Sequence, residues 1–506
     1  MGTSSELASA LTKAHEIAKL NGGPILRSEQ LQRSDRELLL RLQWIQEIIK
    51  GWYLLTNANA PVGDSTIWYA NFWEFLSIYL RFHWEESYCL SAESSLDLHT
   101  KTTIIPHQVI VIAPTGRGAP QELPFQTSVL IYADPSSIPE EREVINGLKV
   151  MQLPYALCKV SPAYFQKNPK EAEIALRLIQ NASELSAVLI KYNFKTAAKR
   201  LIGAYKFLGN EELAINLKNE LLDFGWVVNE ENPFVQTEPL ISSMRMTSPY
   251  VARILSLWSD FRPKVLEYFP DTPDFPEIAQ DYLREVQEIY MQDAYNSLSI
   301  EGYHVNESLI AKVQKQDWNP DIDPQDSQER NALAARGYYE AFLEVKKSVL
   351  LVLQNNNPGE VVKQHLKKWM QALFFPGVRA GIIAASDLIG YRKTAVYIRG
   401  SRHIPLPKEG LIDAMETLFE CLKNEENAAV RAILGHYIFV YIHPYMDGNG
   451  RIGRFLMNTM FASGGYPWTI IRVKNREQYL NALEIAGVDA NIEPFVQFVK
   501  QEMEER

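Results

Sequence analysis

The stretch YIHPYMDGNGRIGRFLMN at residues 441–458 limits the fold of this 506-residue chain more than any other. Residues 429–441 are apolar on nearly every side, which predicts a buried helix. Pro444 and the Gly-Asn-Gly run at 448–450 then force a loop, because proline lacks a backbone donor and glycine tolerates unusual dihedral angles. Residues 451–462 return to helical spacing. The sequence therefore predicts two packed helices, joined by a loop that opens onto the N-terminus of the second.

This loop has the parts of a phosphate site. The first amide groups of a helix lack partners within the helix, and the helix dipole favours an anion there. Gly448 and Gly450 let an anion approach the backbone around Asn449 closely. Arg451 and Arg454 lie three residues apart, near one face of the first turn, where two guanidinium groups can clamp a polyphosphate.

Two more side chains suit chemistry on such a phosphate. Asp447 offers an oxygen ligand of the kind that Mg²⁺ prefers, and His443 offers a base that titrates near neutrality. A lone histidine at a helix end is usually structural, but here a base, a carboxylate, an anion site and two arginines fall close together. Transfer of a nucleotide to a hydroxyl requires these parts.

The run from His443 to Arg454 resembles the Fic family signature, His-x-Phe-x-Asp/Glu-Gly-Asn-Gly-Arg-x-x-Arg, with Tyr445 in place of phenylalanine. The resemblance covers about residues 245–506. It implies an all-helical domain that moves AMP from ATP to a Ser, Thr or Tyr hydroxyl of a protein, itself included. His443 would be the base, and Asp447 would hold Mg²⁺ on the α- and β-phosphates.

The same resemblance assigns roles to the rest of the loop. Gly448, Asn449 and Gly450 would form the anion hole. Arg451 would support the β-phosphate, Arg454 would contact the γ-phosphate, and Asn458 would face the nucleotide.

Fic proteins also carry a β-hairpin flap that aligns the target segment by strand addition. Residues 391–405, YRKTAVYIRGSRHIP, match this region and interrupt an otherwise helical pattern. The predicted target-docking strand consists of Thr394, Ala395, Val396, Tyr397 and Ile398. An ordinary surface hairpin is the alternative.

Residues 296–302, NSLSIEG, place Ser297 and Glu301 on one helix face. This pattern resembles the inhibitory helix of Fic proteins, Ser/Thr-x-x-x-Glu-Gly/Asn, expected here near residues 290–302. In that class the glutamate pairs with the second arginine of the signature, which is Arg454 here, and holds ATP in an unproductive pose. Ser297 would anchor the helix. A plain capped helix is the alternative.

The pattern of residues 1–240 predicts two modules that precede the Fic-like part of the chain. Short helical patterns, a stop at residues 21–23 and a turn at Gly51 before an apolar strand predict a winged helix-turn-helix over residues 1–60. Residues 61–240 begin with an α+β pattern, with strand-like runs at 107–113 and 127–133, and then become helical. The runs LSAESSLDLHT, TTIIPHQVIV, INGLKVMQLPYALCKVSPAYF and AAKRLIGAYKFLGNEELA resemble the winged-helix antitoxins of AbiE type. This resemblance covers about residues 1–230 and implies an N-terminal DNA-reading module and a second module that restrains a toxin. A small protein-contact domain is the alternative, and a linker is expected near residues 230–248.

DNA contact through residues 1–60 and through the basic segment 158–218 is therefore a second hypothesis. Lys191, Lys195 and Lys199 recur every four residues and predict a basic helix face. The alternative is an ordinary solvated face. The net charge of −10 excludes a strongly basic coat over the whole chain but not a local basic surface.

Three widely spaced cysteines, with no apolar signal segment at the N-terminus, predict a cytoplasmic setting. The sequence contains no run of about 18 uncharged apolar residues, so we expect no membrane span. The expected fold is mainly α, with an all-helical Fic core and its β-hairpin flap at 245–506, preceded by the winged helix-turn-helix and the α+β module.

The leading function is an autoinhibited protein adenylyltransferase that uses ATP and Mg²⁺. Three alternatives stay open: a DNA-binding antitoxin or transcription regulator with a Fic domain, a Fic enzyme that uses another nucleotide, and one that removes AMP. The sequence leaves the target protein and homo-oligomer formation open.

Overall fold

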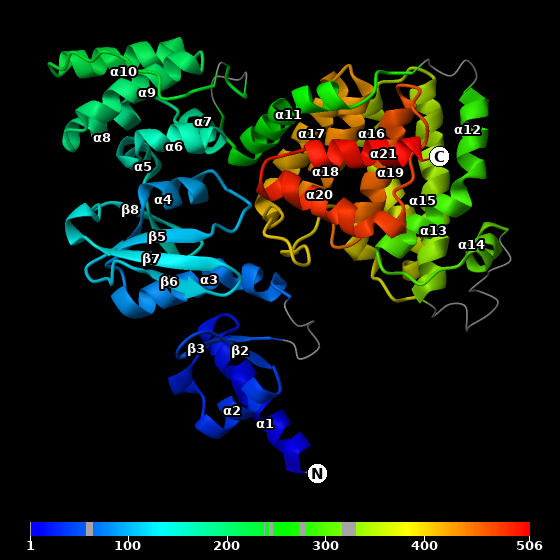
Figure 1. Cartoon of the computed structure of the whole chain (residues 1–506), viewed down its shortest axis with the longest axis horizontal. Coiled ribbons are helices and arrows are strands. Elements are labelled where there is room, and N and C mark those ends of the chain that lie inside the picture. The colour runs from blue at the N-terminus through cyan, green and yellow to red at the C-terminus, as the bar shows by residue number, and fades with distance from the viewer. Residues whose placement is uncertain are drawn as a thin grey trace. The chain divides into compact units, whose positions relative to one another are not determined.

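The computed structural model describes residues 2–56, 64–236, 238–241, 246–273, 279–315 and 330–505. The chain forms two compact units (Figure 1). The first unit contains Met1–Pro249 and Tyr397–Ile404, and the second contains Tyr250–Val396 and Pro405–Arg506. Most described residues are helical, so the mainly α class predicted from the sequence is confirmed. Along the described parts of the chain, no helix is both long and apolar enough to span a bilayer.

The first unit begins with a small helical and stranded segment. Its elements are α1 (Gly2–Asn21), β1 (Ile25–Arg27), α2 (Arg33–Arg41), β2 (Ile45–Ile49) and β3 (Trp52–Leu55). The strands form an antiparallel sheet in the order β1-β3-β2. Gly51 takes a φ of +87° between β2 and β3, a backbone angle that favours glycine at this turn. The winged helix-turn-helix stays a prediction.

An α+β module follows in the same unit. Its sheet has the order β4-β5-β7-β6, and β5 and β7 run parallel. The predicted strands at 107–113 and 127–133 correspond to β5 (Gln108–Ala113) and β7 (Thr127–Ala133). Trp68, Phe72 and Phe75 of α3 are buried in its core. The remaining elements are α3 (Thr66–Trp84), β4 (Cys89–Leu90), α4 (Ala92–His99), β6 (Pro120–Leu123), β8 (Arg142–Ile145) and β9 (Leu148–Met151).

Helices complete the first unit, and here one prediction is wrong. The helices are α5 (Leu153–Lys159), α6 (Pro162–Lys167), α7 (Pro169–Leu178), α8 (Ser183–Lys191), α9 (Lys195–Phe207) and α10 (Glu211–Asp223). Helix α8 ends at Lys191 and α9 begins at Lys195, and Asn193 between them has a φ of +56°. Lys191, Lys195 and Lys199 therefore do not share one helix face.

The second unit is helical. Helix α18 is buried along its whole length from Ala428 to Phe439, as predicted, and it packs against α19. Proline at residue 444 and a positive φ at His443 end α18. The helices are α11 (Pro249–Tyr268), α12 (Ala279–Glu288), α13 (Tyr290–Ile300), α14 (Glu307–Gln314), α15 (Arg330–Leu353), α16 (Pro358–Arg379), α17 (Leu411–Asn424), α18 (Ala428–Ile442), α19 (Asn449–Ala462), α20 (Arg476–Val488) and α21 (Glu493–Glu504).

The predicted β-hairpin flap is not formed. Across residues 391–405, all of which are described, the structure has no strand, and the only pairing is an isolated bridge between His403 and Ile104. Within the first unit, residues of the segment 397–404 bond to the α+β module, and no strand pairs with another inside the segment. The amide of Ile404 donates to the carbonyl of Thr103 at 2.6 Å, and the amide of Gly400 donates to the hydroxyl of Thr66 at 2.9 Å.

Candidate active site

The loop between α18 and α19 is closed by one side chain. Asn449 accepts a hydrogen bond from the amide of Tyr445 at 3.0 Å and donates one to the carbonyl of Tyr445 at 2.8 Å. Gly448 starts α19 with a φ of +84°, and a Cβ atom there would lie 2.9 Å from the ring of Phe374. Glycine is therefore required at 448, and the side chain of Asn449 is used in holding the loop. Only its backbone amide is left for an anion.

Tyr445 anchors this loop in the core. Its side chain is buried, and its ring lies 5.8 Å from the ring of Tyr391 and 6.4 Å from that of Phe439. Tyr445 thus supplies a buried aromatic ring at the position of the signature phenylalanine.

His443 is held in a form that can act as a base. Its Nδ1 lies 3.2 Å from the carbonyl oxygen of Val440. Because a carbonyl only accepts hydrogen bonds, Nδ1 carries the proton and Nε2 has a free lone pair. Burial and the positive charge of Arg392 lower the pKa of His443 below its ordinary value of 6.5, against the opposing effects of Glu301 and Asp447. The imidazole is therefore neutral at pH 7.

Arg454 is 4% exposed and is oriented by residues at the end of α13. Its Nε donates to the hydroxyl of Ser297 at 2.9 Å, and its Nη2 donates to the Ser297 carbonyl at 3.0 Å and to Oε1 of Glu301 at 2.7 Å. Its Nη1 is buried and has no hydrogen-bond partner among the described residues. A Cβ atom on Gly450 would lie 3.2 Å from this nitrogen, so an unused donor lies beside the first turn of α19.

Arg451 and Asp447 form the other side of this turn. Nη2 of Arg451 lies 3.1 Å from Oδ1 of Asp447, and its guanidinium carbon lies 5.2 Å and 5.3 Å from the ring centres of Tyr303 and Phe374. The side chain of Asp447 is 58% exposed. In the described part of the chain no cluster of three metal-ligating side chains occurs. A single open carboxylate suits Mg²⁺, which takes its other ligands from phosphates and water.

Glu301 lies against the same helix start. It follows the last residue of α13, and Gly302, with a φ of +82°, ends that helix. A Cβ atom on Gly450 would collide with the Glu301 carboxylate, so this carboxylate fills the space beside the first turn of α19. Burial alone would raise its pKa, but Arg454 and Arg451 outweigh burial and hold the pKa of Glu301 below its ordinary value. Glu301 is therefore ionised at neutral pH.

A buried carboxyl behind this pair was not predicted from the sequence. Asp293 lies one helical turn before Ser297 on α13, and the Tyr338 hydroxyl donates to its Oδ2 at 2.7 Å. Asp293, Ser297 and Glu301 are spaced by four residues, which is the one sequence signal that would have suggested Asp293. Burial raises the pKa of Asp293, and the bond from Tyr338 opposes that rise.

Other predicted residues lie elsewhere. The side-chain amide of Asn458 bonds to the backbone of Thr469, accepting from its amide at 2.7 Å and donating to its carbonyl at 3.0 Å. The expectation that Asn458 faces the nucleotide is therefore not supported by its contacts. Among the predicted docking residues, Thr394 accepts a hydrogen bond from Arg392 through its carbonyl, and Tyr397 donates to the carbonyl of Ala70.

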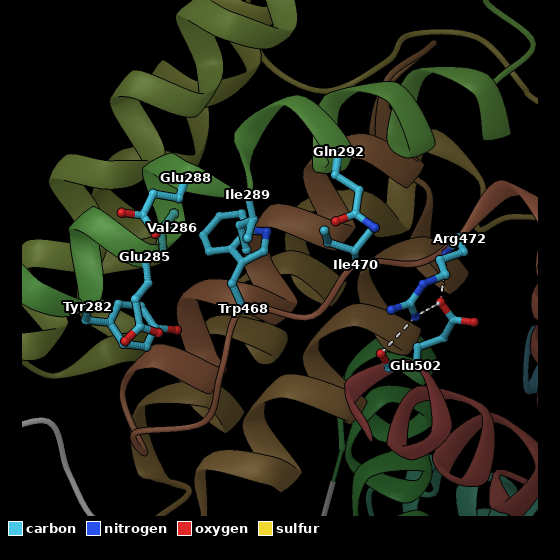
Figure 2. A pocket seen from close by; sticks show the side chains of 10 residues that line it. All are labelled: Tyr282, Glu285, Val286, Glu288, Ile289, Gln292, Trp468, Ile470, Arg472 and Glu502. Carbon is cyan, nitrogen blue, oxygen red and sulfur yellow. Dashed lines mark hydrogen bonds and ion pairs between the residues drawn. The ribbon is translucent and has the colours of Figure 1, made fainter. Parts of the chain in front are cut away.

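A separate cavity of about 280 Å³ in the second unit lies against α12 (Figure 2). Among its described lining residues Arg472 is the only cation, and Glu502 accepts a hydrogen bond from it at 3.1 Å. Glu285 and Glu288 add further negative charge. This cavity does not suit a triphosphate, in contrast to the start of α19.

Comparison with known proteins agrees with this geometry. The model of the Fic/DOC family matches residues 363–461, which include His443, Asp447 and Arg454. This segment is a Fic domain. The matched residues run from α16 through α19, the part of the second unit that carries the loop and the helix start described above.

Relatives match beyond this domain. The chain is 28% identical to a Drosophila mojavensis protein named protein adenylyltransferase Fic, over 66% of this chain and 64% of that one. It is 31% identical to a Culex quinquefasciatus protein of the same name, over 43% and 40%. A Nematostella vectensis protein with that name is 26% identical over 61% of this chain and 74% of its own. The chain thus spans less than two thirds of the Drosophila and Culex relatives.

Solved structures of Fic proteins also match. A Fic-1 structure from C. elegans is 17% identical, with a TM-score of 0.37, over 67% of this chain and 91% of that one. A Fic domain containing signalling protein from Bacteroides thetaiotaomicron is 17% identical, with a TM-score of 0.33, over 50% and 93%.

The bond from Tyr338 to Asp293 gives a stability prediction. Changing Tyr338→Phe removes the donor and leaves a buried carboxyl without that partner, so we expect a loss of about 1–3 kcal/mol in the free energy of unfolding. Urea denaturation of the full chain measures it. Tyr339→Phe, on the neighbouring half-buried tyrosine, is the control and should change stability by less than about 0.5 kcal/mol. Equal losses in the two variants would contradict this assignment.

Proposed function

We propose that this chain is an autoinhibited protein adenylyltransferase, which moves AMP from ATP to a Ser, Thr or Tyr hydroxyl of a protein, itself included. The contact of Glu301 with Arg454, beside the first turn of α19, is the observation that carries the proposal. The Fic domain and the relatives named protein adenylyltransferase Fic support it. The target protein is not specified by any of these observations.

In the proposed reaction the chain orients the triphosphate and removes one proton. The free amides at the start of α19, Arg451 and the unused Nη1 of Arg454 bind phosphate oxygens. Nε2 of His443 takes the proton from the target hydroxyl as its oxygen bonds to the α-phosphorus. The bond from that phosphorus to the bridging oxygen breaks, and pyrophosphate leaves with the electron pair. Mg²⁺, held through Asp447, would neutralise charge on the phosphates.

In the proposed resting state Glu301 competes with the nucleotide. Its carboxylate is 28% exposed and accepts the charge-assisted hydrogen bond that a γ-phosphate oxygen would otherwise accept from Arg454. Ser297 holds Nε of the same guanidinium through its hydroxyl, which fixes the orientation of Arg454. A γ-phosphate that cannot replace Glu301 on Nη2 of Arg454 leaves the α-phosphate misplaced for attack, as positioning accounts for much of the rate of such reactions.

The direct test of this function removes the competing carboxylate. With labelled ATP and Mg²⁺, Glu301→Gly should raise AMP transfer to the chain by about tenfold or more, because Arg454 becomes free for phosphate. Ser299→Gly is the matched control: it loosens the same end of α13 without touching the pair, and it should stay at the wild-type level. Adding His443→Ala to Glu301→Gly should abolish transfer. No transfer by Glu301→Gly, under conditions where ATP binds, would favour the regulator alternative.

The expected pH dependence of AMP transfer follows from the lowered pKa values of His443 and Glu301. The pKa of His443 is lowered, so the rate of Glu301→Gly should fall at acid pH with a midpoint under 6.5 and level off at higher pH. The pKa of Glu301 is also lowered. The pair with Arg454 is therefore fully present above the ordinary value of 4.5 and is lost only as the pH falls through the lower folded pKa. Wild-type transfer should stay low from pH 6 to 9, and a rise within that window would contradict this account.

The finer parts of the sequence hypothesis remain proposals. A cytoplasmic setting is consistent with three unpaired cysteines, of which Cys89 and Cys158 are buried. DNA contact and homo-oligomer formation stay predictions, and part of the basic segment is already neutralised: Arg177 pairs with Glu173 in the core, and Lys206 and Lys218 both pair with Glu230.

Mass spectrometry of Glu301→Gly after incubation with each nucleoside triphosphate would separate ATP from other donors.

A further inference from the structure

A buried cation outside the Fic signature contacts the catalytic loop. Arg392 lies between α16 and α17 in the second unit, and only 5% of its surface is exposed. A guanidinium group keeps its charge at any pH that proteins tolerate, and burying one is costly unless its donors are used. The hydrogen bonds that the guanidinium donates therefore indicate the role of Arg392.

Its donors reach three backbone carbonyls on three segments. Nε donates to the carbonyl of His443 at 2.7 Å, Nη1 donates to that of Thr394 at 3.0 Å, and Nη2 donates to that of Leu406. Its own amide donates to the carbonyl of Pro444 at 2.9 Å. Arg392 thus joins both ends of the 394–406 segment to the two residues that open the catalytic loop.

The contact with His443 falls where the backbone needs support. His443 has φ of 54° and ψ of 60°, the left-handed conformation, which is unfavourable for a residue with a Cβ atom. Its carbonyl lies just past the end of α18, where carbonyls lack partners within the helix. A fixed donor on that carbonyl holds the peptide plane, and the peptide plane sets the direction of the imidazole.

We propose that Arg392 is a positioning residue for His443: its guanidinium fork holds the backbone of the base and fixes it to the two ends of the 394–406 segment. The inference rests on the proposed function, since it assigns His443 the role of base. Arg392 contacts neither of the groups assigned to the phosphates, Arg451 and Arg454, in the hydrogen bonds described above. It acts on the proton transfer step and leaves the nucleotide seat intact.

Two substitutions of Arg392 distinguish the effect of the guanidinium geometry from the effect of the positive charge. Arg392→Lys keeps a cation but presents one nitrogen, which cannot reach three carbonyls in fixed directions. Arg392→Met removes the charge as well. Three charged groups bear on His443, namely Arg392 from its segment, Glu301 from the end of α13 and Asp447 from the loop before α19. Of these the two variants change only the first.

The experiment uses the full chain with Glu301→Gly as background. Adding Arg392→Lys should lower kcat for AMP transfer by about 100-fold, the loss that follows when a reacting group is misplaced by about 1 Å. The Kd for ATP should stay within about twofold, because the phosphate seat is unchanged. Arg379→Lys, at an exposed arginine at the end of α16, is the matched control and should change neither quantity.

Two results would overturn the inference. One is an unchanged kcat in Arg392→Lys. The other is a parallel loss of kcat and of ATP affinity, which would mean that Arg392 only maintains the fold of the domain.

A readout without turnover separates this inference from the proposed function. NMR titration of the nine histidines, with His443→Ala to identify the signal, measures the pKa of His443 directly. We expect Arg392→Met to raise that pKa and Arg392→Lys to leave it nearly unchanged. If Glu301→Gly transfers no AMP but this pattern is found, the proposed function fails and the contact of Arg392 with His443 stands. Equal values in Arg392→Met and the parent chain would overturn the positioning.

Discussion

The guanidinium of Arg454 joins the end of α13 to the first turn of α19, and the rest of the candidate site is arranged around it. Its Nε and Nη2 are bound by Ser297 and Glu301 of the α13 end, while its Nη1 lies unused beside the start of α19. A buried guanidinium needs partners for its donors. If α13 moved away, Nε and Nη2 of Arg454 would therefore lose their hydrogen bonds. A phosphate oxygen can meet the same need, and this makes the carboxylate and the nucleotide alternatives for one cation.

Support for this exchange extends on both sides. Behind this pair, a buried hydrogen bond from Tyr338 to Asp293 ties α13 to α15, so that Ser297 and Glu301 lie at fixed positions. In front, Asn449 closes the loop and Arg392 holds the backbone of His443. The base and the phosphate seat are therefore positioned by different residues. In the proposed resting state, Glu301 can therefore restrain the nucleotide while Arg392 keeps the backbone of His443 in place.

Sequence reasoning succeeded where structure is decided locally. The loop at 443–450 follows from Pro444, from Gly448 and from the unpaired amides of a helix start, all of which are properties of neighbouring residues. The ion pair of Glu301 with Arg454 spans 153 positions and was inferred only through the family resemblance. The carboxyl of Asp293 was missed because its partner Tyr338 lies on another helix, 45 positions away.

The failures have the same physical origin. Residues 394–398 have the composition of a strand. The amide of Gly400, two residues further on, donates to the hydroxyl of Thr66 and so is not available for a hairpin. Thr66 lies 334 positions earlier in the chain, and a local sequence pattern cannot predict such a partner. The expected lysine face is interrupted between α8 and α9, where Asn193 has a positive φ. Asparagine tolerates that conformation better than most residues, so Asn193 is the sequence signal for this break.

The central claim is that Glu301 occupies the seat of the γ-phosphate on Arg454. Calorimetric titration of the full chain with ATP and with ADP, in wild type and in Glu301→Gly, isolates the contribution of that phosphate. In wild type the two nucleotides should bind with similar Kd. In Glu301→Gly ATP should bind about tenfold more tightly than ADP, as one charge-assisted hydrogen bond of about 1.5 kcal/mol is gained. The same ratio of Kd values in both proteins would contradict the account.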